Sequence, residues 1–129
     1  MNPIYATTKK GTIGELVVQL RLLEHDVQAE RPIKDSGNDL IAIRGREFRA
    51  IQVRTTCTGS ICKPRPRVEY HILAIVRLPK IDGEYSTRCA EVFLFPRKQV
   101  PHLSRRLSDY PDSLLNENLI DTLFGGGGF

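Results

Sequence analysis

SGNDLIAI at residues 36–43 and FRAIQVR at residues 48–54 are the two runs that decide the fold. Each predicts a short strand, and the four residues at 44–47 between them predict a tight turn, so the two strands form a hairpin. Side chains along a strand alternate between its two faces. Gln52 and Arg54 therefore share one face of the second strand, while Ile51 and Val53 share the other.

The polar residues of this hairpin are the first candidates for a functional site. Asp39 opens the first strand, and a buried strand needs neither Gln52 nor Arg54 for packing. If the strands pair, an acid, an amide and a cation converge at one end of a sheet, a grouping that suits a divalent metal and a phosphate. The plainer interpretation makes Asp39 a turn residue bonded to local backbone. Gln52 and Arg54 would then be a strand end that emerges into solvent.

Length and composition favour a small basic protein. The 129 residues predict one domain over 1–124, followed by a flexible Gly-rich tail at 125–129. The 40% hydrophobic content is enough for a modest core, and the net charge of +4 with a pI near 9.1 favours a polyanionic partner.

Cysteine usage and hydropathy predict a cytoplasmic protein that does not enter membranes. No apolar run approaches the roughly 20 residues that span a bilayer, and the first ten residues lack the apolar core of a signal peptide. The three cysteines are odd in number, which argues against a disulfide framework and fits a reducing cytosol. A zinc site from Cys57, Cys62, His71 and Cys89 has irregular spacing and is the weaker interpretation.

The remaining elements predict an α/β fold with a central mixed sheet flanked by helices. Apolar spacing indicates a helix from Ile13 to His25, with Thr12 as its N-cap and Glu15 completing a capping box. An edge strand is expected at 27–32, and further strands at 68–78 and 89–95. A terminal helix, capped by Asp112 or Ser113, is expected to run through Phe124. Glu15 can act as a helix cap, as a metal ligand or as both.

A basic loop follows the second strand of the hairpin. Residues 56–67 carry Lys63, Arg65 and Arg67 just downstream of Arg54. Basic side chains in this position can contact phosphates of a nucleic acid. The alternative is a solvated loop with no partner.

Four short segments, taken in order, resemble the PD-(D/E)XK nuclease superfamily. They are KGTIGE at 10–15, NDLI at 38–41, IQVRTT at 51–56 and VFLFPR at 92–97. The third segment is similar to the branch in which glutamine replaces the second acid, as in some small homing endonucleases and related prokaryotic proteins. The resemblance covers roughly residues 9–101 and implies a restriction-endonuclease-like core.

The resemblance implies a metal-dependent DNA endonuclease that hydrolyses phosphodiester bonds. Its catalytic residues would be Asp39, Gln52, Arg54 and Glu15, with Mg²⁺ or Mn²⁺ held by Asp39, Gln52 and Glu15. DNA would be contacted by Lys10 and by the basic loop. The chain departs from the family at Arg54, where lysine is usual, and arginine binds phosphate but is a poor general base.

Two further classes of function remain open. One is a DNA-binding module that keeps the fold without cleavage, and the other is an assembly domain whose terminal helix and tail bind a protein. A homo-oligomer, a dimer or higher, is also expected, because a double-strand break needs two sites. The apolar face of residues 114–124 is the candidate interface, although packing on the chain's own sheet is the favoured role for that face.

Overall fold

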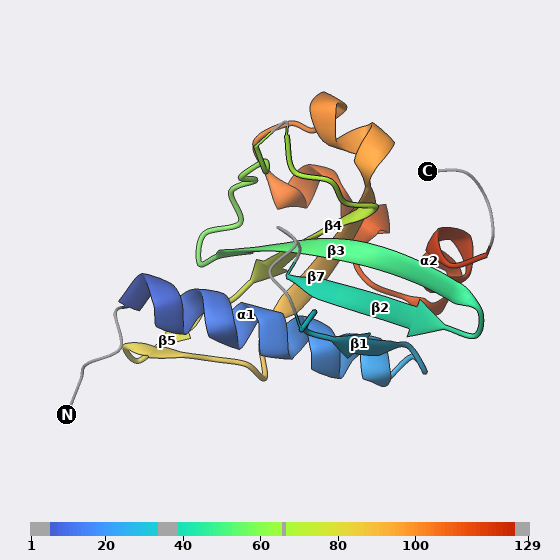
Figure 1. Cartoon of the computed structure of the whole chain (residues 1–129). Helices are drawn as coiled ribbons and strands as arrows, with labels where there is room; N and C mark the ends of the chain where they lie inside the picture. Colours follow the sequence, from blue (N-terminus) through green and yellow to red (C-terminus); the bar gives the residue numbers. More distant parts are fainter. Residues whose placement is uncertain (1–5, 34–38, 66, 126–129) are drawn as a thin grey trace.

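The computed structural model describes residues 6–33, 39–65 and 67–125. Its centre is a five-stranded mixed sheet in the order β1-β2-β3-β4-β7 (Figure 1). The strands are β1 (Gln28–Glu30), β2 (Leu40–Arg44), β3 (Glu47–Thr56), β4 (Ile72–Arg77) and β7 (Glu91–Pro96). Among the strands of the described residues, only β3 and β4 pair in parallel. The predicted α/β fold with a central mixed sheet is confirmed.

Two α-helices, three 3₁₀ turns and a small hairpin complete the described part of the chain. The helices are α1 (Ala6–Leu23) and α2 (Glu117–Leu123), and the 3₁₀ turns are η1 (Arg97–His102), η2 (Leu107–Asp109) and η3 (Pro111–Ser113). The hairpin consists of β5 (Lys80–Ile81) and β6 (Glu84–Tyr85). None of the helices in the described part of the chain is long and apolar enough to cross a membrane.

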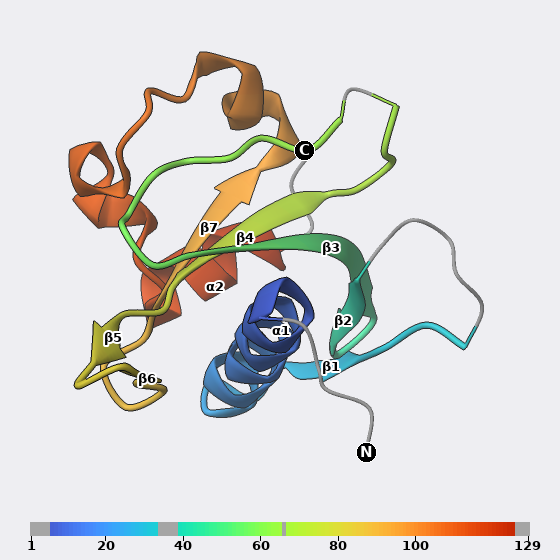
Figure 2. The same ribbon diagram turned by 90° about the vertical axis from the view of Figure 1, so that its left-hand side faces the viewer.

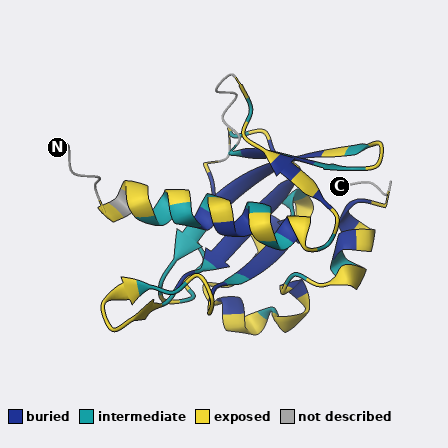
Figure 3. Ribbon diagram, turned by 90° about the horizontal axis from the view of Figure 1, so that it is seen from below, coloured by how far each residue is buried: buried dark blue, intermediate teal, exposed yellow. Residues whose placement is uncertain are grey.

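The two faces of the sheet carry separate apolar cores. The first core lies between the sheet and both α-helices, and it includes Leu22 of α1, Leu123 of α2 and Ile51 of β3. The second core lies on the other face, where Leu73 and Phe95 pack under residues of η1 and η2. Figure 2 shows α1 on one side of the sheet and the orange η1 segment on the other. The central strands are buried from both sides, and the outer surface of α1 is exposed (Figure 3).

The predicted hairpin is present, with a defined register. Leu40 pairs with Ile51 and Arg44 pairs with Glu47, in an antiparallel arrangement. The turn contains Gly45 at φ +61°, a left-handed conformation that glycine adopts without strain. Because this register places Ile51 and Val53 toward α1, Gln52 and Arg54 lie on the opposite face.

The first helix starts earlier than predicted. It begins at Ala6, so Thr12 is in the helix interior and the capping box of Thr12 with Glu15 is wrong. The extra turns lie beside the β5–β6 hairpin, where Ile13 and Tyr85 join the same core. Apolar spacing did not reveal this part of the helix, because residues 6–11 contain no apolar periodicity.

The last helix starts later than predicted. Asn116 is its N-cap and accepts a hydrogen bond from the Leu119 N–H at 2.9 Å, so neither Asp112 nor Ser113 caps it. Ile120 and Leu123 are buried in the chain's own core, so this face is not available as a dimer interface. The predicted turn at 34–38, residues 1–5 and the tail beyond Gly125 lie outside the described residues.

Candidate functional site

Asp39 lies just before β2 and connects it to β3. Its backbone N–H donates to the Ile51 carbonyl at 3.2 Å, and its Oδ2 accepts from the Val53 N–H at 2.8 Å. Since Leu40 pairs with Ile51, the position opposite Asp39 on β3 is that of Gln52. Because β2 begins only at Leu40, the Asp39 carboxylate serves as the acceptor for the Val53 N–H in place of a backbone carbonyl. Its other oxygen, Oδ1, has no hydrogen-bond partner among the described residues.

Gln52 is a buried amide with an unused acceptor. The residue is 6% exposed, and its Oε1 has no hydrogen-bond partner in the described part of the chain. A buried polar atom normally has a hydrogen-bond partner. An unpaired acceptor beside a carboxylate therefore indicates a place where a ligand can bind. An amide oxygen and a carboxylate oxygen are donors that a hard divalent cation prefers. The pair Asp39 and Gln52 therefore fits a Mg²⁺ or Mn²⁺ ion.

Arg54 follows Gln52 on the same face and joins two residues that sequence reasoning did not assign. The Arg97 guanidinium lies 5.0 Å from the ring centroid of Tyr70. Burial raises the pKa of the Tyr70 hydroxyl, while the charges of Arg97 and Arg54 lower it by smaller amounts. Two cations therefore influence one tyrosine on the face of the sheet that carries the second core. The only sequence signal for Arg97 was its place directly after the strand that ends in Pro96.

Glu15 lies on the other side of the sheet from Gln52. It is on α1, and its carboxylate forms an ion pair with Arg31. Gly14, its neighbour, packs directly against Thr55 of β3, which holds this part of the helix close to the strand. No three Asp, Glu, His or Cys side chains of the described residues form a metal-binding group. This result covers Cys57, Cys62, His71 and Cys89, so the zinc interpretation is not supported.

The predicted DNA-binding residues fall into two places. Lys63, Arg65 and Arg67 are exposed on the loop between β3 and β4. This loop lies beside the 97–106 segment, since the Lys63 Nζ donates to the Pro101 carbonyl at 3.3 Å and the Ile61 N–H to that of Arg105 at 2.9 Å. The charges of both segments therefore gather over the second core. Lys10 is apart from them, on α1.

Comparison with known proteins identifies the fold. The sequence matches no known family model and no curated protein. The structure is similar to that of the bacterial homing endonuclease I-Ssp6803I, with a TM-score of 0.59, 16% sequence identity, and coverage of 81% of this chain and 75% of that one. The chain thus has a fold like that of a homing endonuclease, a nuclease-like α/β fold.

Proposed function

We propose that the protein is a metal-dependent DNA endonuclease of the PD-(D/E)XK type, in the branch that uses glutamine in place of the second acid. The observation that carries the proposal is the unpaired, buried Oε1 of Gln52 opposite Asp39. A buried acceptor without a partner lowers the free energy of unfolding by about 1–3 kcal/mol. A bound cation would supply the missing partner of the Gln52 Oε1. The homing-endonuclease-like fold and the net charge of +4 support the same conclusion.

The roles of the residues follow from their chemistry. Asp39 and Gln52 would hold Mg²⁺ or Mn²⁺. Glu15, which is paired with Arg31 on the other side of the sheet, would not be a ligand of the same ion in this arrangement. When bound, the ion polarises a phosphodiester and lowers the pKa of a coordinated water. The planar guanidinium of Arg54 suits phosphate oxygens, so Arg54 would bind the phosphate and stabilise the charge that develops there.

The basic loop would position DNA without reading its sequence. Lys63, Arg65 and Arg67 are exposed cations of the kind that contact the phosphate backbone. Because Lys10 lies on the other face, it would contact a separate part of the duplex or a second duplex. A double-strand break needs two active sites, which two copies related by two-fold symmetry would supply. Light scattering with and without DNA tests this assembly.

A second candidate function is a DNA-binding module that does not cleave. Three observations favour it: Arg54 stands where the nuclease family uses lysine, Glu15 is engaged by Arg31, and Asp39 already accepts a backbone hydrogen bond. In this case the fold and the basic loop would still bind DNA, but the protein would not cleave it. Cleavage and binding assays separate the two functions.

The decisive experiment is nicking of supercoiled plasmid with Mg²⁺, Mn²⁺ or EDTA, combined with a gel shift in EDTA. If the protein is an endonuclease, nicking should depend on the metal, and Asp39→Asn should abolish it. Asparagine keeps an oxygen for the Val53 N–H, so the fold should survive. Asp112→Asn, at an exposed position in η3, is the matched control and should cut normally. Binding without nicking supports the module, and neither activity would refute both functions and favour an assembly domain.

A further inference from the structure

A pocket separate from the candidate site opens on the face of the sheet that carries the second core. Its volume is about 590 Å³, within the range of roughly 300–1,000 Å³ typical of small-molecule sites. It lies where β4 ends and β7 begins, between the loop after β3 and the η2–η3 segment. Neither Asp39, Gln52 nor Arg54 lines it.

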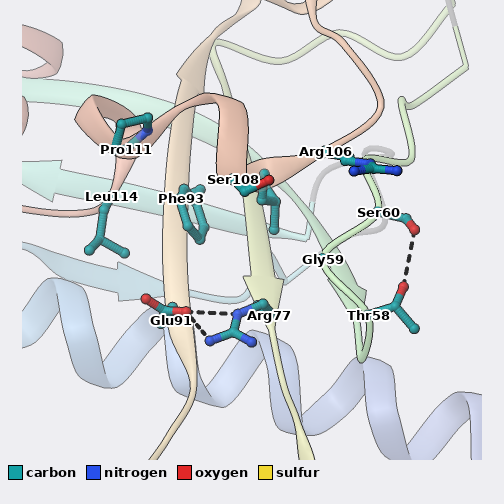
Figure 4. A pocket seen from close by; sticks show the side chains of 11 residues that line it. Thr58, Gly59, Ser60, Arg77, Glu91, Phe93, Arg106, Ser108, Pro111 and Leu114 are labelled. Atoms are coloured by element: carbon teal, nitrogen blue, oxygen red, sulfur yellow. Dashed lines mark hydrogen bonds and ion pairs between the residues drawn. The ribbon is translucent and has the colours of Figure 1, made fainter.

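One wall of the pocket is polar and held in place by backbone pairing. Thr58 and Ser60 share a hydrogen bond between their hydroxyls at 3.0 Å. The backbones of Ser60 and Arg106 pair as an isolated β-bridge, and the Leu107 N–H donates to the Gly59 carbonyl at 2.9 Å. These bonds bring the Arg106 side chain and the two hydroxyls to the same side of the pocket (Figure 4).

The opposite wall is apolar. Phe93 and Leu114 pair through their backbones, and their side chains line the pocket together with Pro111 (Figure 4). Leu114 is 36% exposed, which is unusual for a leucine that flanks a core. Phe93 is only 6% exposed, so Leu114 and Pro111 provide the accessible apolar surface next to the cationic wall.

The charges of the pocket leave one cation for a ligand. Arg77 is neutralised by Glu91, with its Nε 2.7 Å from the Glu91 Oε1. Arg106 forms no ion pair or hydrogen bond through its side chain with any described residue, and it is exposed. An occupant that satisfies both walls has one anionic group and one flat apolar group.

We propose that this pocket binds a single nucleotide, with the phosphate on Arg106 and the hydroxyls of Thr58 and Ser60, and the base against Leu114 and Pro111. Charge-assisted hydrogen bonds from a guanidinium are the strong contacts to phosphate, and a base provides the flat apolar group. The occupant is either a free nucleotide or one unstacked from a DNA strand. The second source rests on the proposed function, and the first does not.

The test is a titration of the isotope-labelled full chain with dAMP and dTMP in EDTA, followed by NMR. Saturable shifts are expected at Gly59, Ser60 and Phe93. Arg106→Ala should weaken binding about tenfold, the loss expected for one charge-assisted contact. Arg105→Ala is the matched control, because Arg105 is adjacent and exposed but does not line the pocket, and it should change affinity less than about twofold. Ser108→Trp, which fills the pocket, should abolish binding.

Four results would overturn the proposal: shifts that do not saturate by about 10 mM nucleotide, equal losses from Arg105→Ala and Arg106→Ala, full binding by Ser108→Trp, or equal affinity for inorganic phosphate alone. A second arm compares a fully paired duplex with one that carries an unpaired thymidine. A preference for the unpaired site, lost in Arg106→Ala, identifies a DNA strand as the source, and no preference identifies a free nucleotide. Neither arm needs a metal or cleavage, so a failure of this proposal can be told apart from a failure of the nicking assay.

Discussion

Gly11 and Gly14 lie on the same helix, three residues apart, and the same substitution should have opposite effects at the two positions. A Cβ added at Gly11 would meet no atom within 4 Å. A Cβ added at Gly14 would overlap the Thr55 hydroxyl and lie 3.0 Å from the Thr55 Cβ. Gly14 is therefore what lets α1 approach β3 closely, directly beside Glu15.

The magnitudes follow from two opposing effects. Replacing glycine by alanine inside a helix stabilises it by about 1 kcal/mol, because the unfolded chain loses freedom. Overpacking a close contact costs about 1–3 kcal/mol. Gly11→Ala should therefore raise the free energy of unfolding by about 1 kcal/mol. The free energy of unfolding of Gly14→Ala should be about 1–3 kcal/mol lower than that of Gly11→Ala. Urea unfolding measures both values.

Thr55→Ala supplies the internal check, because it removes the atoms that the new methyl group would strike. In the Gly14→Ala background it should restore part of the lost stability, with a coupling of about 0.5–3 kcal/mol in a double-mutant cycle. If Gly11→Ala and Gly14→Ala stabilise the protein equally, α1 does not contact β3 at Gly14. The placement of Glu15 near the strand would then be wrong as well.

Three further outcomes are expected. Arg54→Lys should keep or raise the nicking rate, and Arg54→Ala should lower it roughly a hundredfold to a thousandfold; a parental rate in Arg54→Ala would contradict the site. Replacing all three cations of the basic loop by alanine should reduce the slope of log affinity against log salt by about 0.9 for each lost phosphate contact, and an unchanged slope would exclude the loop. Because burial raises the pKa of Tyr70 above 10.0 in the folded state, the folded protein retains this proton at pH values where the unfolded chain loses it. Stability should therefore fall as the pH rises above 10.0, and Tyr70→Phe should remove that part of the decline in urea unfolding at a series of pH values.

The hairpin could be predicted from the sequence because its signals are local. Alternation with period two and a glycine in the turn fix the strands and the faces of their side chains. Once the register is known, Asp39 falls opposite Gln52 without further information. The sequence alone is therefore enough to predict that Asp39 and Gln52 lie opposite each other in the candidate site.

The rest of the site depends on contacts between distant segments, which no local pattern encodes. Tyr70 and Arg97 come together with Arg54 only because a loop and a 3₁₀ turn cross the same face of the sheet. Arg49 is another example. It occupies an ordinary strand position in the sequence, yet it is buried and donates to the Leu123 carbonyl at 3.0 Å, which fixes the end of α2.

Gln52 provides the sharpest test of whether the buried polar pair serves function rather than stability. Its Oε1 has no partner among the described residues, whereas Gln19 donates to the Ala29 carbonyl at 3.0 Å. Gln52→Met, which keeps the volume and removes the unpaired acceptor, should therefore raise the free energy of unfolding by about 1–3 kcal/mol. Gln19→Met is the matched control and should lower it, because it breaks a made hydrogen bond.

The same two variants should respond differently to metal. A cation that binds only the folded state raises the melting temperature of the parent and of Gln19→Met, and it should not raise that of Gln52→Met. If Gln52→Met is destabilised like Gln19→Met, the amide oxygen has a partner in solution, and the reason to place a cation there disappears. If Gln52→Met is stabilised and still gains from Mg²⁺, the ion binds elsewhere. Only a gain in stability together with a loss of the metal response agrees with Gln52 as a ligand.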